Sequence, residues 1–248
     1  DGSTNSIPAL KTIAFMPLAA IAQSWSPKVQ TLDPNLGTWG VVGEFNKLIV
    51  VNGNPAIAYF DGGRANLIYR RATDASGTAF GPGITIDSLA TVGYSLSFQI
   101  VSGNPAIAYY DNTNQDLKFV RALDANGTKW GDPISVDVTG NVGLYASLQV
   151  VNNHPAIAYY DYTNGELKFV RATNTTGSTW GTPLSVDVTG DVGGYASMQL
   201  VNGNPAIAYY DFTNTNLKYI RAADISGTTW NSALTLDTSL AAGKYASL

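Results

Sequence analysis

Oxygen-bearing side chains recur in short loops, and they are the first candidates for chemistry in this sequence. Asp111, Asn114 and Asp116 lie in one loop, in the pattern Asp-x-Thr-Asn-x-Asp. Carboxylate and amide oxygens at this density are ligands that calcium takes in protein loops. The pattern decays in other copies, because Glu166 and then Asn216 replace Asp116. Asx turns explain Asp and Asn equally well. We therefore predict no metal site and no other cofactor, and a calcium loop is the open alternative.

The same loops also combine aromatic rings with planar hydrogen-bonding groups, which suit the recognition of sugars. A tyrosine precedes the loop Asp in three copies. These rings are candidates for stacking, although tyrosine also often buries its ring and exposes only the hydroxyl. Trp39 stands apart in a longer loop, 35–40, and is the best single candidate for a solvent-facing stacking residue. The predicted ligand-binding residues are Trp39, Tyr110, Asp111, Asn114, Tyr160, Asp161, Asn164, Tyr210, Asp211 and Asn214.

An enzymatic interpretation needs residues that break the repetition, because an active site is one asymmetric place. A glycosidase requires two opposed carboxylates. Glu44 stands where other copies have Leu, Gly or Lys, and Lys47 stands where they have Ser. We expect these two to form an ordinary structural ion pair, since charged pairs are more often structural than catalytic. The carboxylates outside the recurring positions are Asp1, Glu44, Asp116, Asp132, Glu166 and Asp191.

Other catalytic arrangements are missing from the sequence. His154 is the only histidine, and it replaces the Asn of an Asn-Gly-Asn-Pro turn, so we expect a surface role. No Ser-His-Asp set, phosphate loop or paired-His metal motif occurs. We therefore predict no catalytic residue and no enzymatic activity.

The elements that must position these loops follow a strict repeat. The segment Asn-Pro-Ala-Ile-Ala-Tyr-Tyr-Asp recurs almost unchanged, and its prolines, at 55, 105, 155 and 205, are spaced by fifty residues without insertion. Within one copy, alternating or apolar runs predict strands over 145–151, 156–160, 167–171 and 184–188. Turns rich in Asn and Gly separate them. Four short strands per repeat of this length are typical of a β-propeller blade.

The turn between the third and fourth strands carries a family resemblance. Residues 124–130 read Asp-Ala-Asn-Gly-Thr-Lys-Trp, and 174–180 and 224–230 follow the same pattern. This pattern resembles the Asp-box, or BNR repeat, of sialidase-like β-propellers, with one more residue between Asp and Gly. The resemblance implies that the box is a folding element on the face away from the active site. There Asp caps the hairpin, Gly takes a left-handed conformation and the aromatic ring packs between sheets.

The resemblance also bears on activity. A sialidase is expected to gather three arginines around the carboxylate of its substrate. The recurring arginines, at 71, 121, 171 and 221, end the third strands near the box, which is the opposite face. The resemblance therefore implies a sialidase-like fold without the sialidase catalytic set.

The two ends of the chain complete the predicted architecture. Residues 245–248 open a further inner strand, and the segments 8–15, 18–23 and 29–33 parallel a second, third and fourth strand. We therefore predict an all-β, five-bladed β-propeller of four-stranded antiparallel blades, with one blade closed by both termini. Residues 1–248 would form a single domain, with a split blade made of about 1–33 plus 245–248. Such closure removes exposed sheet edges. A fragment of a longer repeat protein is the alternative.

Composition restricts the partners. The 248 residues carry a net charge of −4, charged residues are only 13%, and no block of Lys or Arg occurs. Nucleic acids and anionic membranes require a basic surface, so we predict neither as a partner. No apolar run is long enough to span a bilayer. The segment 11–22 resembles a signal peptide, but two further strands are the better interpretation. The chain lacks cysteine, which excludes disulfides.

These observations lead to one preferred function and two others. We predict a secreted or cell-surface, non-enzymatic, multivalent binding module, lectin-like, with repeated sites for glycans or glycosylated surfaces. Several weak sites on repeated blades would gain strength by avidity. The alternative is a structural module of a surface protein or filament, with self-assembly as its interaction. A glycoside hydrolase is the interpretation that the residues favour least.

Overall fold

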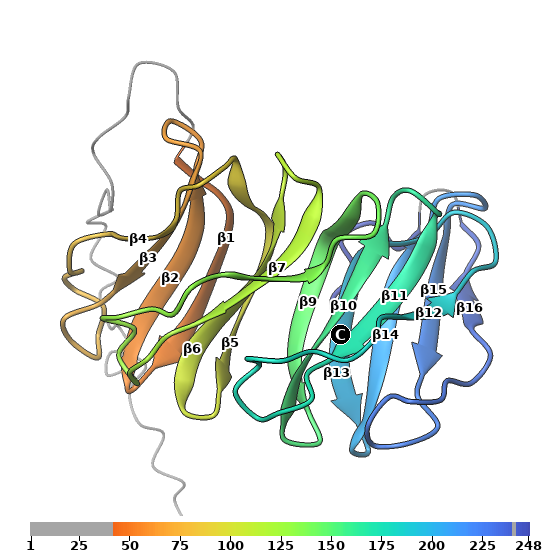
Figure 1. The fold of residues 1–248 in the computed structure, drawn as a ribbon. Helices are drawn as coiled ribbons and strands as arrows, with labels where there is room; N and C mark the ends of the chain where they lie inside the picture. Colours follow the sequence, from red (N-terminus) through yellow and green to blue (C-terminus); the bar gives the residue numbers. More distant parts are fainter. Residues whose placement is uncertain (1–41, 240–241) are drawn as a thin grey trace, which may run out of the picture. The chain divides into compact units, whose positions relative to one another are not determined.

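The computed structural model describes residues 42–239 and 242–248, and these residues form an all-β body. Four antiparallel sheets of four strands follow one another in chain order, and in each sheet neighbouring strands are consecutive in sequence (Figure 1). We call the sheets blades 1 to 4. Blade 1 contains β1 (Val42–Val51), β2 (Asn54–Asp61), β3 (Asn66–Arg71) and β4 (Ile84–Asp87); blade 2 contains β5 (Val92–Val101), β6 (Asn104–Asp111), β7 (Asp116–Arg121) and β8 (Ile134–Asp137). Blade 3 contains β9 (Val142–Val151), β10 (His154–Asp161), β11 (Glu166–Arg171) and β12 (Leu184–Asp187); blade 4 contains β13 (Val192–Val201), β14 (Asn204–Asp211), β15 (Asn216–Arg221) and β16 (Leu234–Asp237).

Local sequence explains the first hairpin of every blade. In blade 1, Asn52 and Gly53 both have positive φ, 43° and 82°. Two consecutive residues in this conformation make the type I′ turn, whose twist matches that of the flanking strands. Blade 3 uses Asn152 and Asn153 instead, with φ of 46° and 64°, because asparagine tolerates this region better than other side chains. The turn fixes the register, so β9 pairs Val151 with His154.

The core lies between consecutive blades. The second strand of each blade is buried on both faces, and in β10 the residues Ala156, Ile157, Ala158 and Tyr159 are fully buried. One apolar cluster fills each of the three junctions between the four blades. A strand enclosed on both sides needs apolar residues at every position, which explains the near-continuous run of this segment.

The predicted role of the box turn is confirmed by its geometry. The Asp124 carboxylate accepts hydrogen bonds from Asn126 N at 2.9 Å and Lys129 N at 2.8 Å. The Trp130 indole donates to the Gly127 carbonyl at 2.8 Å, and its ring packs edge-on against Tyr69 of the preceding blade. The box therefore both closes its hairpin and joins two blades. The fold is a sialidase-like propeller, as the comparisons below support.

A buried polar cluster also joins each pair of blades. Asp87, at the end of β4, accepts hydrogen bonds from the Tyr109 hydroxyl at 2.6 Å and from Lys118 Nζ at 2.7 Å, both in the next blade. Lys118 Nζ also lies 3.5 Å from Asp111 Oδ2 across its own hairpin. We call this arrangement the interblade lock. Its equivalents are Asp137 with Tyr159 and Lys168, and Asp187 with Tyr209 and Lys218.

The innermost strands are linked as well. Leu148 N donates to Ser97 Oγ at 2.9 Å, and Met198 N donates to Ser147 Oγ at 2.9 Å. Leu248 N donates to Ser197 Oγ at 3.1 Å in the same way. Leu248 therefore follows the same hydrogen-bonding series, although residues 242–248 form a turn and an irregular segment and no strand.

The structure bears out the predicted fold class in part. The all-β propeller of four-stranded antiparallel blades is confirmed. The number of blades differs, because four complete blades are described in place of the predicted five. Of the predicted split blade, residues 1–33 lie outside the described residues, and 245–248 form no strand.

Candidate functional site

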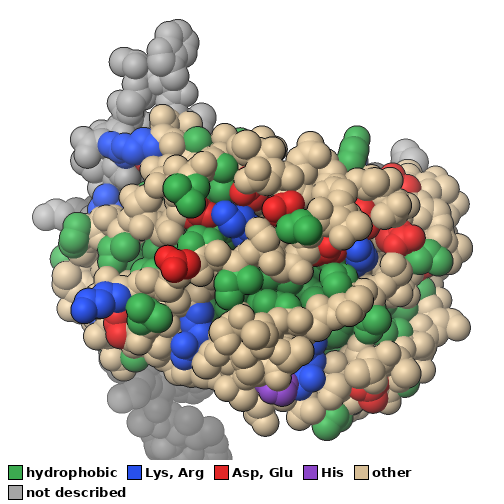
Figure 2. All heavy atoms as spheres, in the orientation of Figure 1, with side chains coloured by type: hydrophobic (Ala, Val, Ile, Leu, Met, Phe, Trp, Pro, Cys, Tyr) green, Lys and Arg blue, Asp and Glu red, His purple; other side chains and the backbone are tan. Residues whose placement is uncertain are grey.

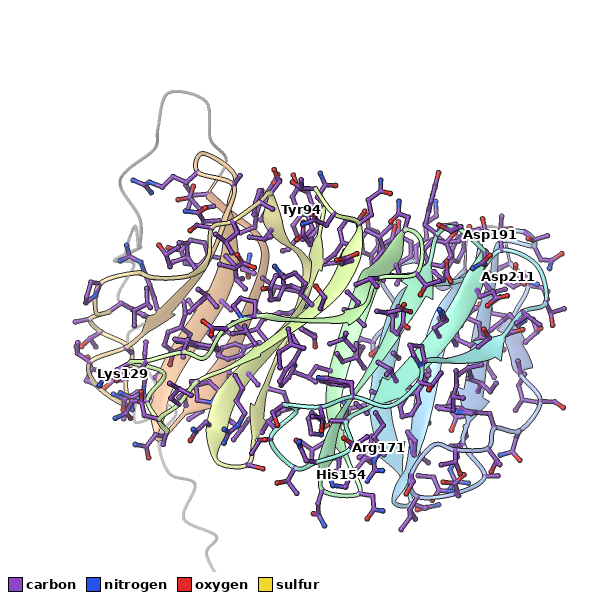
Figure 3. The ribbon with its side chains drawn as sticks, viewed as in Figure 1. Tyr94, Lys129, His154, Arg171, Asp191 and Asp211 are labelled. Atoms are coloured by element: carbon purple, nitrogen blue, oxygen red, sulfur yellow. The ribbon has the colours of Figure 1, made fainter. Side chains whose placement is uncertain are left out.

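A central cavity of about 580 Å³ lies where the inner strands meet. The same three positions of five consecutive repeats line it: residues 45–47, 95–97, 145–147, 195–197 and 245–247. Lys129 of the box and His154 lie at one end of the blades, whereas Tyr94, which directly precedes the cavity residue Ser95, lies at the opposite end with Asp191 and Asp211 (Figure 3). The sequence placed the ligand face at this same end.

A local distortion of each inner strand turns side chains toward the cavity. The pairing of the first and second strands shifts register near the third residue of the inner strand, as between Glu44 and Lys47. A non-glycine residue with positive φ lies at each such shift, for example Tyr145 at 55° and Tyr195 at 53°. Left-handed backbone costs about 1–2 kcal/mol for an L-residue. Strained positions of this kind cluster at functional sites. The remaining members of the series are Phe45, Ser95 and Tyr245.

Three tyrosines form a continuous aromatic wall of the cavity. The ring centroids of Tyr145 and Tyr195 are 4.5 Å apart, and those of Tyr195 and Tyr245 are 4.6 Å apart. We call these three residues the tyrosine arc. Burial, together with the hydrogen bond to Tyr195, raises the pKa of Tyr145 to about 12. Its hydroxyl is therefore neutral at physiological pH and can both donate and accept hydrogen bonds.

The aromatic surface extends beyond the cavity over blades 3 and 4. Phe212 packs against Tyr160 with centroids 5.4 Å apart and against Tyr210 at 5.0 Å. Tyr162, which is 62% exposed, stands edge-on to Tyr160. Blade 2 has Asn112 at the position of Tyr162 and Phe212. The rim of the cavity is therefore asymmetric, although the blades that form it are nearly identical.

The predicted tyrosines lie at this rim, but their rings are buried. Tyr110, Tyr160 and Tyr210 are each at most 4% exposed. The Tyr110 hydroxyl donates to Asn141 Oδ1 at 2.8 Å, and the Tyr160 hydroxyl donates to Asp191 Oδ1 at 2.5 Å. Burial and then the Asp191 carboxylate raise the pKa of Tyr160. Burial of the ring with a bonded hydroxyl was the alternative that the sequence left open.

The predicted Asp and Asn residues form hairpin caps. Asp111 is fully buried, and its Oδ1 accepts hydrogen bonds from Thr113 N and Asn114 N, both at 3.0 Å. Asn114, which is exposed, donates its side-chain amide to Asp111 Oδ2 at 2.9 Å. This is the geometry of an Asx turn. The pairs Asp161–Asn164 and Asp211–Asn214 repeat it. A ligand-binding role for these residues stays a prediction.

Other predicted features have separate outcomes. Trp39 lies outside the described residues. Glu44 and Lys47 are both exposed, and no salt bridge joins them in the described part of the chain, so the predicted ion pair is not formed. His154 contacts Arg171 at the far end of the blades, and burial and this arginine lower its pKa. In residues 42–239 and 242–248, no helix has the length and apolarity needed to cross a membrane.

The sequence analysis did not identify the tyrosine arc. Tyr145, Tyr195 and Tyr245 were assigned to the opening of an ordinary alternating strand. The available signal was the aromatic residue that recurs at one phase of the repeat, with Phe45 as a further member. A glycine with positive φ recurs two residues before each tyrosine, as Gly143, Gly193 and Gly243, and it marks the distorted stretch of the backbone.

Comparisons with known proteins support the propeller. No protein-family model matches the chain, and no curated protein matches it in sequence. Among solved structures, it is similar to an exo-β-1,3-galactanase from Phanerochaete chrysosporium, in complex with β-1,3-galactotriose (TM-score 0.56, 8% identity, 79% of this chain and 50% of the other). It is also similar to the α-L-arabinofuranosidase PaAbf62A from Podospora anserina, in complex with cellotriose (TM-score 0.54, 14% identity, 86% of this chain and 73% of the other). A third similar structure is the NanB sialidase of Streptococcus pneumoniae (TM-score 0.54, 9% identity, 84% of this chain and 53% of the other). The chain spans about half the length of the galactanases.

These neighbours correct the predicted function. The sequence analysis predicted a non-enzymatic, lectin-like module with repeated sites, whereas the neighbours are glycoside hydrolases. At this level of identity the likeness shows the fold alone, a propeller that these glycoside hydrolases share. The physical reason for the error is that the repeated loops, which suggested repeated sites, are used as caps. The prediction that the protein is not an enzyme conflicts with the same neighbours.

Proposed function

We propose that this protein is a carbohydrate-active β-propeller that acts on a saccharide bound in the central cavity. The observation that carries the proposal is the tyrosine arc, with ring centroids 4.5 and 4.6 Å apart along one wall of the cavity. The apolar face of a sugar ring packs on an aromatic surface, and its hydroxyls bond to phenol and serine groups. The volume of about 580 Å³ suits a small-molecule ligand. The carbohydrate-bound neighbours support the same ligand class.

Glycoside hydrolysis is the chemistry that we propose for this site, because the structural neighbours are glycoside hydrolases. Such hydrolysis uses two carboxylates. Glu44 directly precedes the cavity residue Phe45, is exposed and breaks the repeat, so it is the candidate for one of them. No carboxylate lines the cavity among the described residues. A second carboxylate is therefore not assigned.

Saccharide binding is tested by titrating the full-length protein with a panel of oligosaccharides in a calorimeter, after a glycan array has selected the panel. The variant Tyr195→Ala removes the middle ring of the arc, and we expect its affinity to fall by about tenfold or more, in keeping with the loss of one stacked ring. Tyr162→Ala is the matched control, since this tyrosine is exposed on the same face but does not line the cavity. Equal losses in both variants would refute a binding site in the cavity.

Hydrolysis is tested separately by product analysis with the oligosaccharides that bind. The variant Glu44→Gln keeps the size of the side chain and removes its charge. We expect turnover to fall by about a hundredfold or more, the effect of losing a general acid or base. Unchanged turnover in this variant would remove Glu44 from the mechanism, while absent turnover in the wild type would reject hydrolysis and leave the binding test standing.

We further propose the finer features that the sequence predicted. Residues 1–33 together with 245–248 complete a fifth blade, and the box turns relate the chain to the Asp-box proteins. The protein acts outside the cell or at its surface. The hydrogen bond from Leu248 N to Ser197 Oγ supports the fifth blade. The hydrogen bonds within the box support the relation to the Asp-box proteins.

A further inference from the structure

Lys47 breaks the repeat at a position where the other copies make a structural hydrogen bond. Serine occupies this position at 97, 147, 197 and 247. Ser97 Oγ and Ser147 Oγ each accept a hydrogen bond from the backbone of the next inner strand, at 2.9 Å. A lysine ammonium has no lone pair and cannot accept one. Blade 1 therefore gives up a contact between inner strands that the other blades keep.

The position of Lys47 in the central cavity suggests a role for its charge. Lys47 lines the central cavity and is the one charged side chain among its described lining residues. It forms no salt bridge in the described part of the chain. The lysines on the third strands of blades 2 to 4, by contrast, are all held by the carboxylates of interblade locks; they are Lys118, Lys168 and Lys218. Within the described residues this ammonium has no carboxylate partner, so it is available to pair with an anion that enters the cavity.

Lys47 and the tyrosine arc come from different strands of the same cavity wall. Lys47 is on β1, whereas Tyr145 and Tyr195 are on β9 and β13. A ligand that fills the cavity can therefore place a sugar ring on the arc and an acidic substituent at Lys47 Nζ. Neutral hydroxyls of serine line the space between them.

We propose that the saccharide bound in the central cavity carries an anionic substituent, a carboxylate or a sulfate, which pairs with Lys47. This inference rests on the proposed function and adds the chemical class of the sugar. The two anions share the same recognition by an ammonium, and the experiment distinguishes them.

The test compares sugars that differ only in charge. The full-length protein is titrated with a neutral oligoglucoside, with its C6-oxidised oligoglucuronate and with its sulfated form. We expect one acidic form to bind about tenfold more tightly than the neutral one, because a hydrogen bond to a charged group contributes more than a neutral one. The acidic form that binds more tightly identifies the substituent. The advantage is expected to shrink at high salt, which screens an exposed charge.

The variant Lys47→Ser installs the residue that the other repeats use, and we expect it to bind acidic and neutral oligomers equally. Because serine restores the missing acceptor, its urea midpoint should equal or exceed that of the wild type, which separates charge loss from misfolding. Lys244→Ser is the matched control: Lys244 lies over Tyr210, outside the cavity lining, and its loss should keep the preference. Equal binding of acidic and neutral forms by the wild type, or a preference that survives in Lys47→Ser, would overturn the inference alone. Absence of binding to every oligomer would overturn the proposed function with it.

Discussion

The interblade locks and the central cavity are built from the same repeat, but the locks use the same residues in each copy and the cavity does not. The locks keep Asp, Tyr and Lys at fixed positions in three successive junctions, with Asp–Tyr distances of 2.5–2.6 Å. The cavity receives equivalent backbone positions from five repeats, and it combines the recurring tyrosine of the arc with departures such as Phe45 and Lys47. The difference teaches that the contacts between blades require the same residues in each copy, whereas the cavity tolerates departures from the repeat. On the face drawn in Figure 2, charged side chains are likewise scattered and form no basic patch.

The largest effect is expected from breaking one lock. Asp137→Ala removes the acceptor of Tyr159 and Lys168 and leaves a largely buried ammonium without its closest partner. Such a loss costs about 3–5 kcal/mol of unfolding free energy. Urea unfolding followed by circular dichroism measures it. Asp237→Ala is the matched control, because Asp237 occupies the same repeat position but is exposed and, among the described residues, bonds only to Ser239, and we expect little change. Similar losses at both positions would show that the lock does not depend on the next blade.

A smaller effect is expected at the box turn. Gly177 has φ of 76°, and a Cβ added there would approach the Phe119 ring to 2.6 Å. Gly203 has nearly the same φ, 80°, but open space around it. In both variants the alanine must adopt a positive φ, which costs free energy. Only in Gly177→Ala does the added Cβ also collide with the Phe119 ring. We expect Gly177→Ala to be about 2 kcal/mol less stable than Gly203→Ala, in the range for overpacking. Equal urea midpoints would mean that the box is not packed against the preceding blade.

The locks also predict a dependence on pH. Burial tends to raise the pKa of Asp137, but the hydrogen bonds from Tyr159 and Lys168 outweigh burial, so the pKa is lowered. A carboxyl with a lowered folded pKa contributes stability above its unfolded pKa of about 3.9, and the contribution is lost as pH falls through the folded value. We expect the unfolding free energy to decline below about pH 4. The slope should be shallower in Asp137→Asn, and a variant with the same slope would exclude this carboxyl as a cause.

The smallest effect on stability is expected in the cavity. Tyr195→Gly removes a ring but also relieves a positive φ of 53°. Loss of the ring contacts lowers stability and relief of the positive φ raises it, so we expect the unfolding free energy to change by less than about 1 kcal/mol. Saccharide binding should nevertheless be lost in calorimetry. A large loss of stability would place Tyr195 with the folding residues and remove the contrast between the two regions.

The fold was largely predictable because its signals are local and repeated. The strands predicted at 156–160 and 167–171 correspond to β10 and β11, and the Asn-Gly turns and box residues behave as their chemistry suggests. The predicted strand at 145–151 was too short, since β9 begins at Val142. The register shift within β9 places a tyrosine in left-handed backbone, and no intrinsic preference of tyrosine announces such a position.

Only the end of the blades that carries the site could be predicted. The residues of the site could not, because they meet only when the blades pack together. The loops around Asp111 and Asp161 lie at the correct end, but their carboxylates are used as caps. Tyr145 and Tyr195 are separated by fifty residues in sequence and become neighbours only when blades 3 and 4 are assembled. Lys47, by contrast, was visible as a break in the repeat, although its partner was predicted incorrectly as Glu44.

The direction of the contacts between blades bears on how the chain is made. Each later blade inserts its Tyr and Lys onto an Asp of the blade before it, and its box Trp onto a ring of that same blade. During synthesis, blade 1 leaves the ribosome before blade 2, so each new repeat finds its docking surface already folded. A chain of nearest-neighbour contacts of this kind can grow by propagation, one unit at a time. The direction of these contacts therefore allows the blades to assemble in the order in which they are translated.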